Sequence, residues 1–265
     1  MKRFLVLTYG VVNYVVCLGV FLYLAAFIGN LWVPRSMDST PVAPLWWALL
    51  TDTLLIALFG IQHSVMARPS FKRWWTKFVP EPIERSTYVM FANAALILLF
   101  SFWQPLGGTV WDVGAPTGRA ALWTLYAVGW LTVLGTTFLI NHFDLFGLRQ
   151  VWLYFRGKPY THIGFRTPGP YRFVRHPLYV GWITAFWATP TMTLTHLVFA
   201  LGMTAYILIA IPFEERNLVM YHGESYAGYR RRVPMLIPGL GGRGGKLREG
   251  TPPTLGTKSA THPRG

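Results

Sequence analysis

Cysteine is almost absent from this chain of 265 residues, and the single one, Cys17, lies within an apolar segment. A lone cysteine has no partner in the chain, which excludes an internal disulfide and any cysteine-based metal cluster. A reactive thiol is one interpretation of Cys17, but we favour a small buried hydrophobic side chain. We therefore expect no metal site.

Charged side chains are also scarce, since they make up 13% of the residues while hydrophobic ones make up 52%. A single soluble domain of this size cannot bury so much apolar surface, so the composition indicates an integral membrane protein. The first apolar segment, residues 4–33, has no Asp, Glu, Lys or Arg and exceeds the ~20 residues that span a bilayer. It lacks a small-residue cleavage site after a short apolar core, so we interpret it as a retained helix.

Acidic residues are the scarcer charge, with 10 Asp and Glu against 24 Lys and Arg and a formal net charge of +14. In a soluble protein this excess suggests nucleic acid, but here its placement matters more, and we expect no nucleic-acid partner. Residues 34–44 and 107–119 hold one cation each, whereas residues 67–86 hold five and residues 142–177 hold six. The positive-inside rule then places the second pair of loops and the basic N-terminus in the cytoplasm.

Five apolar stretches define the expected fold, at residues 4–33, 45–66, 87–106, 120–141 and 178–212. Pro190 interrupts the last stretch, so we expect it to double back as a shallow hairpin. Each arm would have ~15 residues, or about 22 Å, which is less than a full ~30 Å crossing. The predicted fold is an all-α integral membrane protein with four long transmembrane helices and a short C-terminal helical hairpin, five to six membrane helices in total.

The rest of the chain predicts one folded domain, residues 1–238. Residues 239–265 are rich in Gly, Pro, Thr and basic residues with almost nothing to bury, so we expect a disordered basic tail. The sequence contains no internal repeat, P-loop or GxGxxG motif, which argues against a soluble Rossmann-type nucleotide site. Asp52 lies in the outer half of the second apolar stretch, where we expect a packing role.

The unusual polar clusters fall on the side assigned to the cytoplasm. Four of them can converge on one pocket: "GIQHSVMARP", "FLINHFDLFGLRQ", "RTPGPYRFVRHPLYVGW" and "IPFEERNLVMYHGESYAGYRRRVP". In "RHP", Pro177 keeps His176 out of the helical region and fixes an extended start to the next helix. This directs the side chains of Arg175 and His176, which suits recognition of a carboxylate. The alternative is an interfacial anchor whose Arg, Tyr and Trp side chains lie among lipid headgroups.

An acidic pair, Glu214 and Glu215, follows Pro212 at the far end of the last apolar stretch. Two adjacent carboxylates at a membrane border are unfavourable unless they meet cations or hydrogen-bond donors. One interpretation is a structural salt bridge to Arg175 and its neighbours. The other is a ligand that carries an amine, a carboxylate and sugar hydroxyls.

The pattern RHPxYxG, followed by a long apolar run and EE, resembles the cofactor half of the membrane methyltransferases typified by isoprenylcysteine carboxyl methyltransferase and phosphatidylethanolamine methyltransferase. The resemblance covers residues 165–235, within a cofactor half that we place at residues 142–238. It implies that this segment binds S-adenosylmethionine. The cofactor-binding residues that it implies are Arg175, His176, Tyr179, Gly181, Glu214 and Glu215. We group Tyr171 with them.

The stretches "QHSVMARPSFKRWW", "ERSTY" and "INHFDLFGLRQVWLYFRGKPY" extend the similarity to residues 1–238 and to one branch. That branch is the bacterial methanethiol S-methyltransferases, which are related to the NnrU-like membrane proteins. The resemblance implies S-adenosylmethionine-dependent methylation of methanethiol to dimethyl sulfide, with hydrogen sulfide as a lesser substrate. The expected location is the cytoplasmic face of the bacterial inner membrane, with both termini cytoplasmic. The expected partners are a small volatile thiol and membrane lipids, with no obligatory protein partner.

Methyl transfer to a thiol requires the thiolate, positioned in line with the leaving sulfur. On the cysteine scale, with a pKa of ~8.5, deprotonation at pH 7 costs about 2 kcal/mol, so a base is useful but need not be strong. The available bases are His63, His142 and Asp144. His142 and Asp144 lie two residues apart, so on a continuous helix only one of them faces inward.

We assign proton handling to Asp144 and His63, with His142 third, and expect Asp144 to hold His63 in one tautomer. The structural alternatives are an interfacial position for His63 and a salt bridge from Asp144 to Arg149. We expect Arg149 and Arg172 to orient substrate or developing charge, unless they face lipid phosphate.

The sequence is also compatible with other functions. A methyltransferase of this kind could act on a lipid or prenylcysteine acceptor instead. A haem- or quinone-binding membrane protein could use His63 and His142 as ligands. A catalytically silent NnrU-like accessory protein is a further alternative, which the presence of both RHPLY and EE argues against.

Overall fold

The computed structural model describes residues 1–161 and 163–240. It is 70% helical with almost no strand, which confirms the expected all-α membrane fold. Five of the described helices are long and apolar enough to cross a membrane: α1 (Lys2–Ile28), α2 (Leu45–Met66), α4 (Glu81–Phe102), α5 (Pro116–Ile140) and α9 (Leu194–His222).

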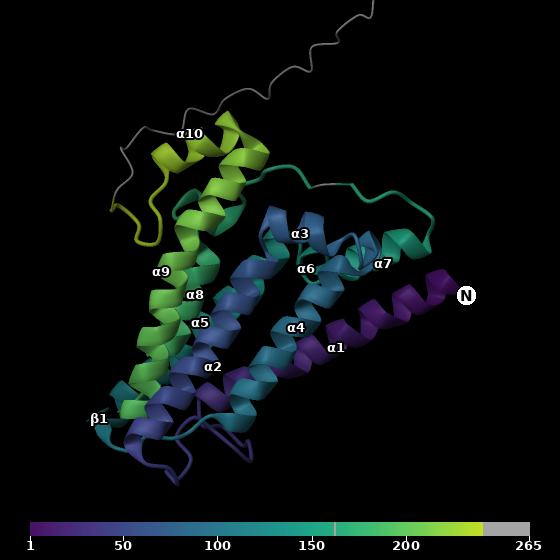
Figure 1. The fold of residues 1–265 in the computed structure, drawn as a ribbon. Coiled ribbons are helices and arrows are strands. Elements are labelled where there is room, and N and C mark those ends of the chain that lie inside the picture. The colour runs from purple at the N-terminus through teal and green to yellow at the C-terminus, as the bar shows by residue number, and fades with distance from the viewer. Residues whose placement is uncertain (162, 241–265) are drawn as a thin grey trace, which may run out of the picture.

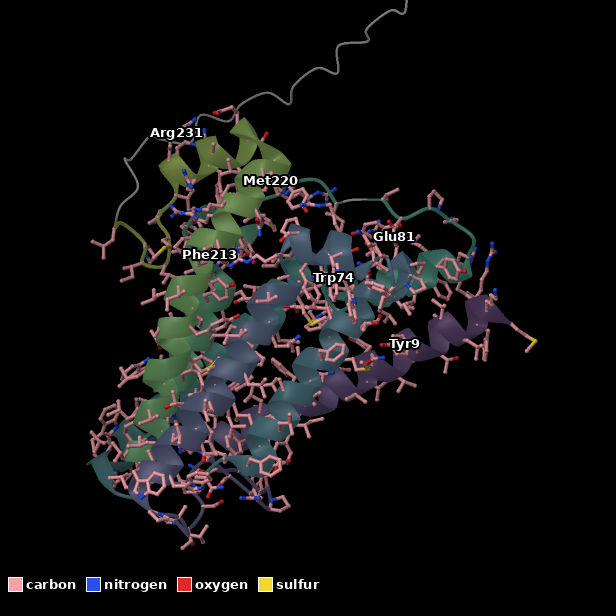
Figure 2. The ribbon with its side chains drawn as sticks, in the orientation of Figure 1. Tyr9, Trp74, Glu81, Phe213, Met220 and Arg231 are labelled. Atoms are coloured by element: carbon pink, nitrogen blue, oxygen red, sulfur yellow. The ribbon has the colours of Figure 1, made fainter. Side chains whose placement is uncertain are left out.

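The shorter elements lie mainly at one end of the bundle (Figure 1). We call it the basic end; it carries the N-terminus and most of the short helices. The opposite end, which we call the ribbon end, carries two short strands, β1 (Thr109–Asp112) and β2 (Thr191–Thr193), paired antiparallel. The short helical elements are α3 (Pro69–Trp75), α6 (His142–Leu145), α7 (Leu148–Phe155), η1 (Gly169–Arg172), α8 (Pro177–Trp187) and α10 (Glu224–Arg232). Figure 2 shows Trp74, Glu81 and Arg231 at the basic end.

The helix ends differ from the apolar stretches for local reasons. The first helix stops at Ile28, because Asn30 and Trp32 adopt positive φ angles of 53° and 50° that no helix continues through. α4 begins at Glu81 and α5 at Pro116, several residues before their apolar runs. Each has a proline in its first turn, where the missing N–H is not needed.

The C-terminal hairpin is deeper than the sequence suggested. Its arms are unequal, with 11 residues in α8 and 29 in α9, and Pro212 lies inside α9. The turn between the arms contains β2, which pairs with β1 at the ribbon end (Figure 1). The expected short, equal arms are therefore wrong: residues 188–193 are largely extended, which covers more distance per residue than a helix.

Two glycines allow α8 to lie directly against α5. A Cβ atom on Gly129 would lie 2.7 Å from the backbone nitrogen of Ala185, and one on Gly181 would lie 2.9 Å from the carbonyl oxygen of Gly129. Small residues of this kind let membrane helices approach closely. The contact holds the start of α8, and with it the RHP motif, against the bundle.

The apolar side chains are distributed as a membrane protein requires. A buried aromatic cluster that includes Phe27, Trp103 and Phe199 fills the space between helices. Other large apolar side chains face outward, such as Leu22 at 67% and Leu131 at 66% exposure. An apolar outer surface of this extent is unfavourable in water and suits hydrocarbon.

Candidate active site

The RHP motif starts α8 at the basic end. His176 has φ −125° and ψ 62°, outside the helical region, and Pro177 is the first residue of the helix, as expected. The backbone N–H of Arg175 donates to the carbonyl of Pro234 at 2.8 Å, and that of His176 donates to the carbonyl of Met235 at 3.2 Å. The segment that follows α10 therefore holds this turn in place.

Glu215 of α9 is the centre of a buried ion pair. Its Oε1 accepts hydrogen bonds from Nε of Arg175 at 2.6 Å and from Nε2 of His176 at 3.1 Å. Nη1 of Arg230 lies 3.9 Å from Oε2. Buried charges of this kind are stable only while every partner is present. The salt-bridge interpretation of the acidic pair thus applies to Glu215.

Glu214, the adjacent residue, has a different environment. Its side chain is 44% exposed, accepts a hydrogen bond from the Tyr179 hydroxyl at 2.7 Å and lies 3.9 Å from Nδ1 of His176. A carboxylate has about four acceptor positions, so most of its capacity stays open. Glu214 is the member of the pair that can contact a ligand.

Three further residues of the predicted cofactor and substrate site have distinct surroundings. The carbonyl of Tyr171 accepts a hydrogen bond from the Tyr229 hydroxyl at 2.6 Å, and burial, with the nearby charge of Glu214, raises the pKa of Tyr171. Arg172 is exposed, and no carboxylate of the described residues lies within 4.0 Å of it. Gly181 faces α5, so helix packing accounts for this glycine, and its contact with a cofactor stays a prediction.

His63, near the end of α2, pairs with a residue that sequence reasoning missed. Its Nε2 lies 2.9 Å from the hydroxyl oxygen of Tyr88 in α4, and that hydroxyl also donates to the His63 carbonyl at 3.4 Å. Both contacts are satisfied together when Nε2 carries the proton and donates to Tyr88. Nδ1 is then an acceptor; in the described part of the chain it is buried and has no hydrogen-bond partner. Such a nitrogen can take a proton from a substrate.

A second tyrosine, Tyr206 of α9, packs beside this pair. The Ser64 hydroxyl donates to the Tyr206 hydroxyl at 3.3 Å. The Tyr206 ring lies against Gly60, where a Cβ atom would approach it to 2.9 Å. The ring of Phe59, which stacks on His63 at 5.3 Å, meets Tyr206 edge to face at 6.1 Å.

Tyrosine hydroxyls contact both His63, through Tyr88, and the acidic pair, through Tyr179. Tyr88 and Tyr206 also lie in the neighbourhood of Glu214 and Tyr179. Tyr88 belongs to α4, Tyr179 to α8 and Tyr206 to α9. No sequence signal singled out Tyr88 or Tyr206, because tyrosines are common at the borders of membrane spans. We call Tyr88, Tyr179 and Tyr206 the tyrosine cluster.

Asp144 forms an ion pair at the edge of this region. Its Oδ1 accepts from Nη1 of Arg149 at 2.9 Å, and its Oδ2 accepts from the Tyr160 hydroxyl at 3.2 Å. The expected hydrogen bond in which Asp144 accepts from His63 is wrong: Nε2 of His63 meets Tyr88, and its Nδ1 has no partner among the described residues. The chain turns at Gly147, whose φ is 86°, between Asp144 and Arg149. This turn brings the Arg149 guanidinium next to the Asp144 carboxylate.

His142 points the other way from Asp144, as their spacing predicted. Its Nε2 lies 2.8 Å from the Tyr14 hydroxyl of α1, and its Nδ1 lies 2.7 Å from the Thr137 hydroxyl of α5. The ring also stacks on Phe138 at 4.1 Å. Burial lowers the pKa of His142. With both nitrogens bonded, His142 joins α1 to α5, and its catalytic role stays a prediction.

The geometry thus brings together one group of predicted residues and leaves others at its edge. The turn before α8, the acidic pair of α9 and the end of α2 meet around the tyrosine cluster. The Asp144–Arg149 pair borders this region, and His142 faces α1.

Close relatives of the chain are methyltransferases by name. It is 54% identical over 238 residues to a methanethiol S-methyltransferase of Mycobacterium tuberculosis, an alignment that covers 90% of this chain and 98% of the relative. It is also 54% identical over 241 residues to a methanethiol S-methyltransferase of Crocosphaera subtropica, covering 91% and 94%. Nurim of Rattus norvegicus is more distant, with 29% identity over 197 residues that cover 71% of this chain and 72% of Nurim. No family model and no solved structure matches the chain.

Proposed function

The chain belongs to the methanethiol S-methyltransferase family, and from that premise we propose that it methylates methanethiol to dimethyl sulfide with S-adenosylmethionine as the donor. Hydrogen sulfide is a lesser substrate in this proposal. The observation that supports it most is the contrast within the acidic pair. Glu215 is buried in ion pairs, whereas Glu214 keeps open acceptor positions at the same end of the bundle as the unpartnered Nδ1 of His63.

The donor set at the basic end fits a molecule that carries charges of both signs. Glu214 can accept hydrogen bonds from an ammonium group or ribose hydroxyls, and Arg172 has no carboxylate partner in the described part of the chain and can meet a carboxylate. When bound, S-adenosylmethionine supplies a methyl group on a sulfonium sulfur. In this proposal Arg175, His176 and Glu215 hold the turn and the start of α8, while Glu214, Arg172, Tyr171 and Tyr179 touch the ligand.

The residues around His63 supply the rest of the chemistry. The Nδ1 of His63 accepts the thiol proton, and Tyr88 holds the ring in the tautomer that leaves Nδ1 free. The aromatic rings exclude water and attract a sulfonium cation through their faces. Asp144 is the second candidate for proton handling, with Arg149 holding its carboxylate.

The placement in the membrane follows from charge. We propose that the basic end faces the cytoplasm of a bacterial inner membrane, since its loops hold most of the cations. The five long helices and the α8 arm make six passes between the two ends, so both the N-terminus and α10 lie at the basic end (Figure 1). Membrane lipids and a small thiol are the partners, and no protein partner or nucleic acid is required.

The haem alternative meets an obstacle in the histidines themselves. Both ring nitrogens of His142 already bond hydroxyl groups, and Nε2 of His63 bonds Tyr88. Coordination of iron by both residues would require the Tyr14 or Thr137 contact to break.

The decisive experiment uses full-length protein in lipid nanodiscs with S-adenosylmethionine labelled in its methyl group. Methanethiol is added and labelled dimethyl sulfide is measured in the headspace, with hydrogen sulfide, a prenylated cysteine and phosphatidylethanolamine as separate arms. Labelled dimethyl sulfide supports the proposal. Methylation of a lipid or prenyl acceptor without dimethyl sulfide overturns the substrate, and absence of every labelled product overturns the methyltransferase.

A matched pair of variants tests the location. Glu214→Gln should abolish most of the labelled dimethyl sulfide. Glu224 is an 86% exposed carboxylate on α10 that pairs with Arg231, so Glu224→Gln should leave the product intact. Equal activity of the two variants would move the site elsewhere.

A further inference from the structure

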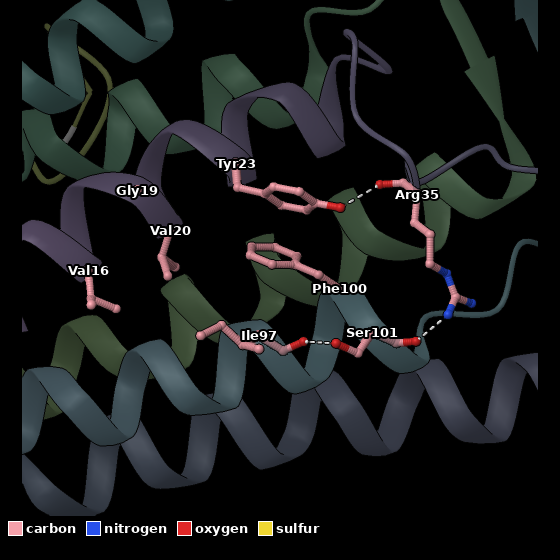
Figure 3. A pocket seen from close by; sticks show the side chains of 8 residues that line it. All are labelled: Val16, Gly19, Val20, Tyr23, Arg35, Ile97, Phe100 and Ser101. Atoms are coloured by element: carbon pink, nitrogen blue, oxygen red, sulfur yellow. Dashed lines mark hydrogen bonds between the residues drawn. The ribbon is translucent and has the colours of Figure 1, made fainter.

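A groove lies between α1 and α4, away from the candidate active site (Figure 3). It has a volume of about 420 Å³, within the range of small-molecule sites. Val16, Gly19 and Val20 of α1 and Ile97 of α4 line its length. The stretch of α1 that borders it, from Val16 to Tyr23, rises about 10 Å toward the ribbon end. Both helices are candidate membrane spans, so this groove faces hydrocarbon.

The groove exists because one side chain is missing. A Cβ atom on Gly19 would meet no other atom within 4 Å, so nothing fills the space beside it. The rings of Tyr23 and Phe100, 4.8 Å apart, close the groove toward the ribbon end. The lining is apolar over most of its length.

The ribbon end of the groove carries a single cation. The Tyr23 hydroxyl donates to the Arg35 carbonyl at 3.1 Å, and Nη1 of Arg35 donates to the carbonyl of Ser101 at 2.6 Å (Figure 3). Ser101 lies in the last turn of α4, where carbonyl groups lack helical partners and attract cations. These two contacts hold the guanidinium at the groove while most of its five N–H donors stay unused. No carboxylate of the described residues lies within 4.0 Å of it.

We propose that this groove binds one anionic phospholipid, with an acyl chain along Val16, Gly19 and Ile97 and the phosphate on Arg35. The occupant is chosen by charge complementarity: an apolar channel within a membrane span that ends in an unpaired guanidinium matches hydrocarbon joined to phosphate. An arginine fork matches phosphate geometry, and a zwitterionic headgroup would bring an ammonium group toward the same cation. The site is independent of the proposed methyl transfer.

Native mass spectrometry of the full-length protein tests the proposal. Protein in detergent is titrated with phosphatidylglycerol or phosphatidylcholine, and bound lipids per monomer are counted. We expect one tightly retained phosphatidylglycerol, and retention about tenfold weaker for phosphatidylcholine, because its ammonium group opposes the charge of Arg35.

Two variants, each with a matched control, locate the lipid. Gly19→Leu fills the groove and should remove the retained lipid, whereas Gly135→Leu, at another exposed glycine whose added Cβ meets nothing within 4 Å, should not. Arg35→Gln keeps a donor for Ser101 and should remove the preference for phosphatidylglycerol, whereas Arg119→Gln at the same end should preserve it. Unchanged lipid retention in Gly19→Leu would overturn the site. A dimer that Gly19→Leu dissociates would assign the groove to a second copy and also overturn it.

Discussion

The two ends of the bundle use their polar side chains differently. At the ribbon end, side chains bond mainly to backbone groups: Asp52 accepts from the N–H of Gln104 at 2.9 Å, and Thr195 accepts from the N–H of Leu106 at 2.8 Å. These contacts anchor the segment that joins α4 to β1. Replacing them with a ligand would require the backbone to move.

At the basic end, the side chains of the candidate site bond to other side chains. Glu215 meets Arg175, Tyr179 meets Glu214, and His63 meets Tyr88. An exposed bond such as that between Tyr179 and Glu214 can be exchanged for a ligand without disturbing a helix. This difference is consistent with the proposed site at the basic end, and variants at each end test it.

The largest effect is expected for Glu215→Gln. It leaves Arg175 buried without its carboxylate, which typically costs 3–5 kcal/mol. The free energy of unfolding in detergent should fall by about 3 kcal/mol, while Glu214→Gln should change it by less than about 1 kcal/mol because that side chain is largely open. Equal loss in both variants would contradict the division of roles within the pair.

Removal of the proton acceptor should come next. His63→Gln should lower kcat about 100-fold, the lower range for a general base. Tyr88→Phe keeps the ring and loses the hydroxyl, so kcat should fall less and its dependence on pH should shift. The measurement is the pH profile of kcat with KM for S-adenosylmethionine as the control. A raised KM with unchanged kcat would place both residues in binding instead.

Glu214→Gln should weaken S-adenosylmethionine binding about tenfold or more, since a charge-assisted hydrogen bond contributes roughly 1.5–3 kcal/mol. Titration calorimetry measures it directly, without dependence on the thiol. The Glu224→Gln variant serves as its control on α10. Binding that is unchanged by Glu214→Gln would remove Glu214 from the ligand site.

A smaller effect concerns pH. Burial lowers the pKa of His142, so the folded chain binds fewer protons there than the unfolded chain, whose histidine titrates near pH ~6.5. Stability from this residue is therefore present above that pH and is lost on acidification below it. Thermal unfolding from pH 7.5 to 5.5 should show a shallower loss in His142→Gln than in the native chain. A steeper loss in the variant would contradict the buried neutral ring.

The smallest effect is expected at the ribbon end, for Asp52→Asn. Asp52 is fully buried, and its Oδ2 has no hydrogen-bond partner among the described residues. Asparagine keeps the acceptor for Gln104 and removes a potential charge, so stability should change by less than about 1 kcal/mol and turnover should not change. A large loss of turnover would show that the ribbon end takes part in the chemistry.

Much of the fold was accessible from the sequence because its signals are local. Apolar runs longer than a bilayer predicted four helices, and Pro177 and Pro190 predicted the start of α8 and the turn that ends it. The depth of the hairpin was not accessible, because it depends on the pairing of β2 with β1, about 80 residues earlier in the chain.

For the site, residue types predicted that the polar motifs gather at one end of the bundle, but they did not predict which side chains pair there. The sequence predicted that Asp144 pairs with His63, but Asp144 pairs with Arg149 and His63 pairs with Tyr88. Tyr88 and Tyr206 carried no signal of their own, because a tyrosine in an apolar run is common at membrane borders.

The sequence by itself determined that the chain spans a membrane, where its first four membrane helices lie and which end carries the charged motifs, because hydrophobicity and proline act over neighbouring residues. Only the tertiary structure decided that Glu215 is buried against Arg175 while Glu214 stays open. Adjacent residues on a helix point about 100° apart, and which of them meets a cation depends on α8 and α10 packing against α9.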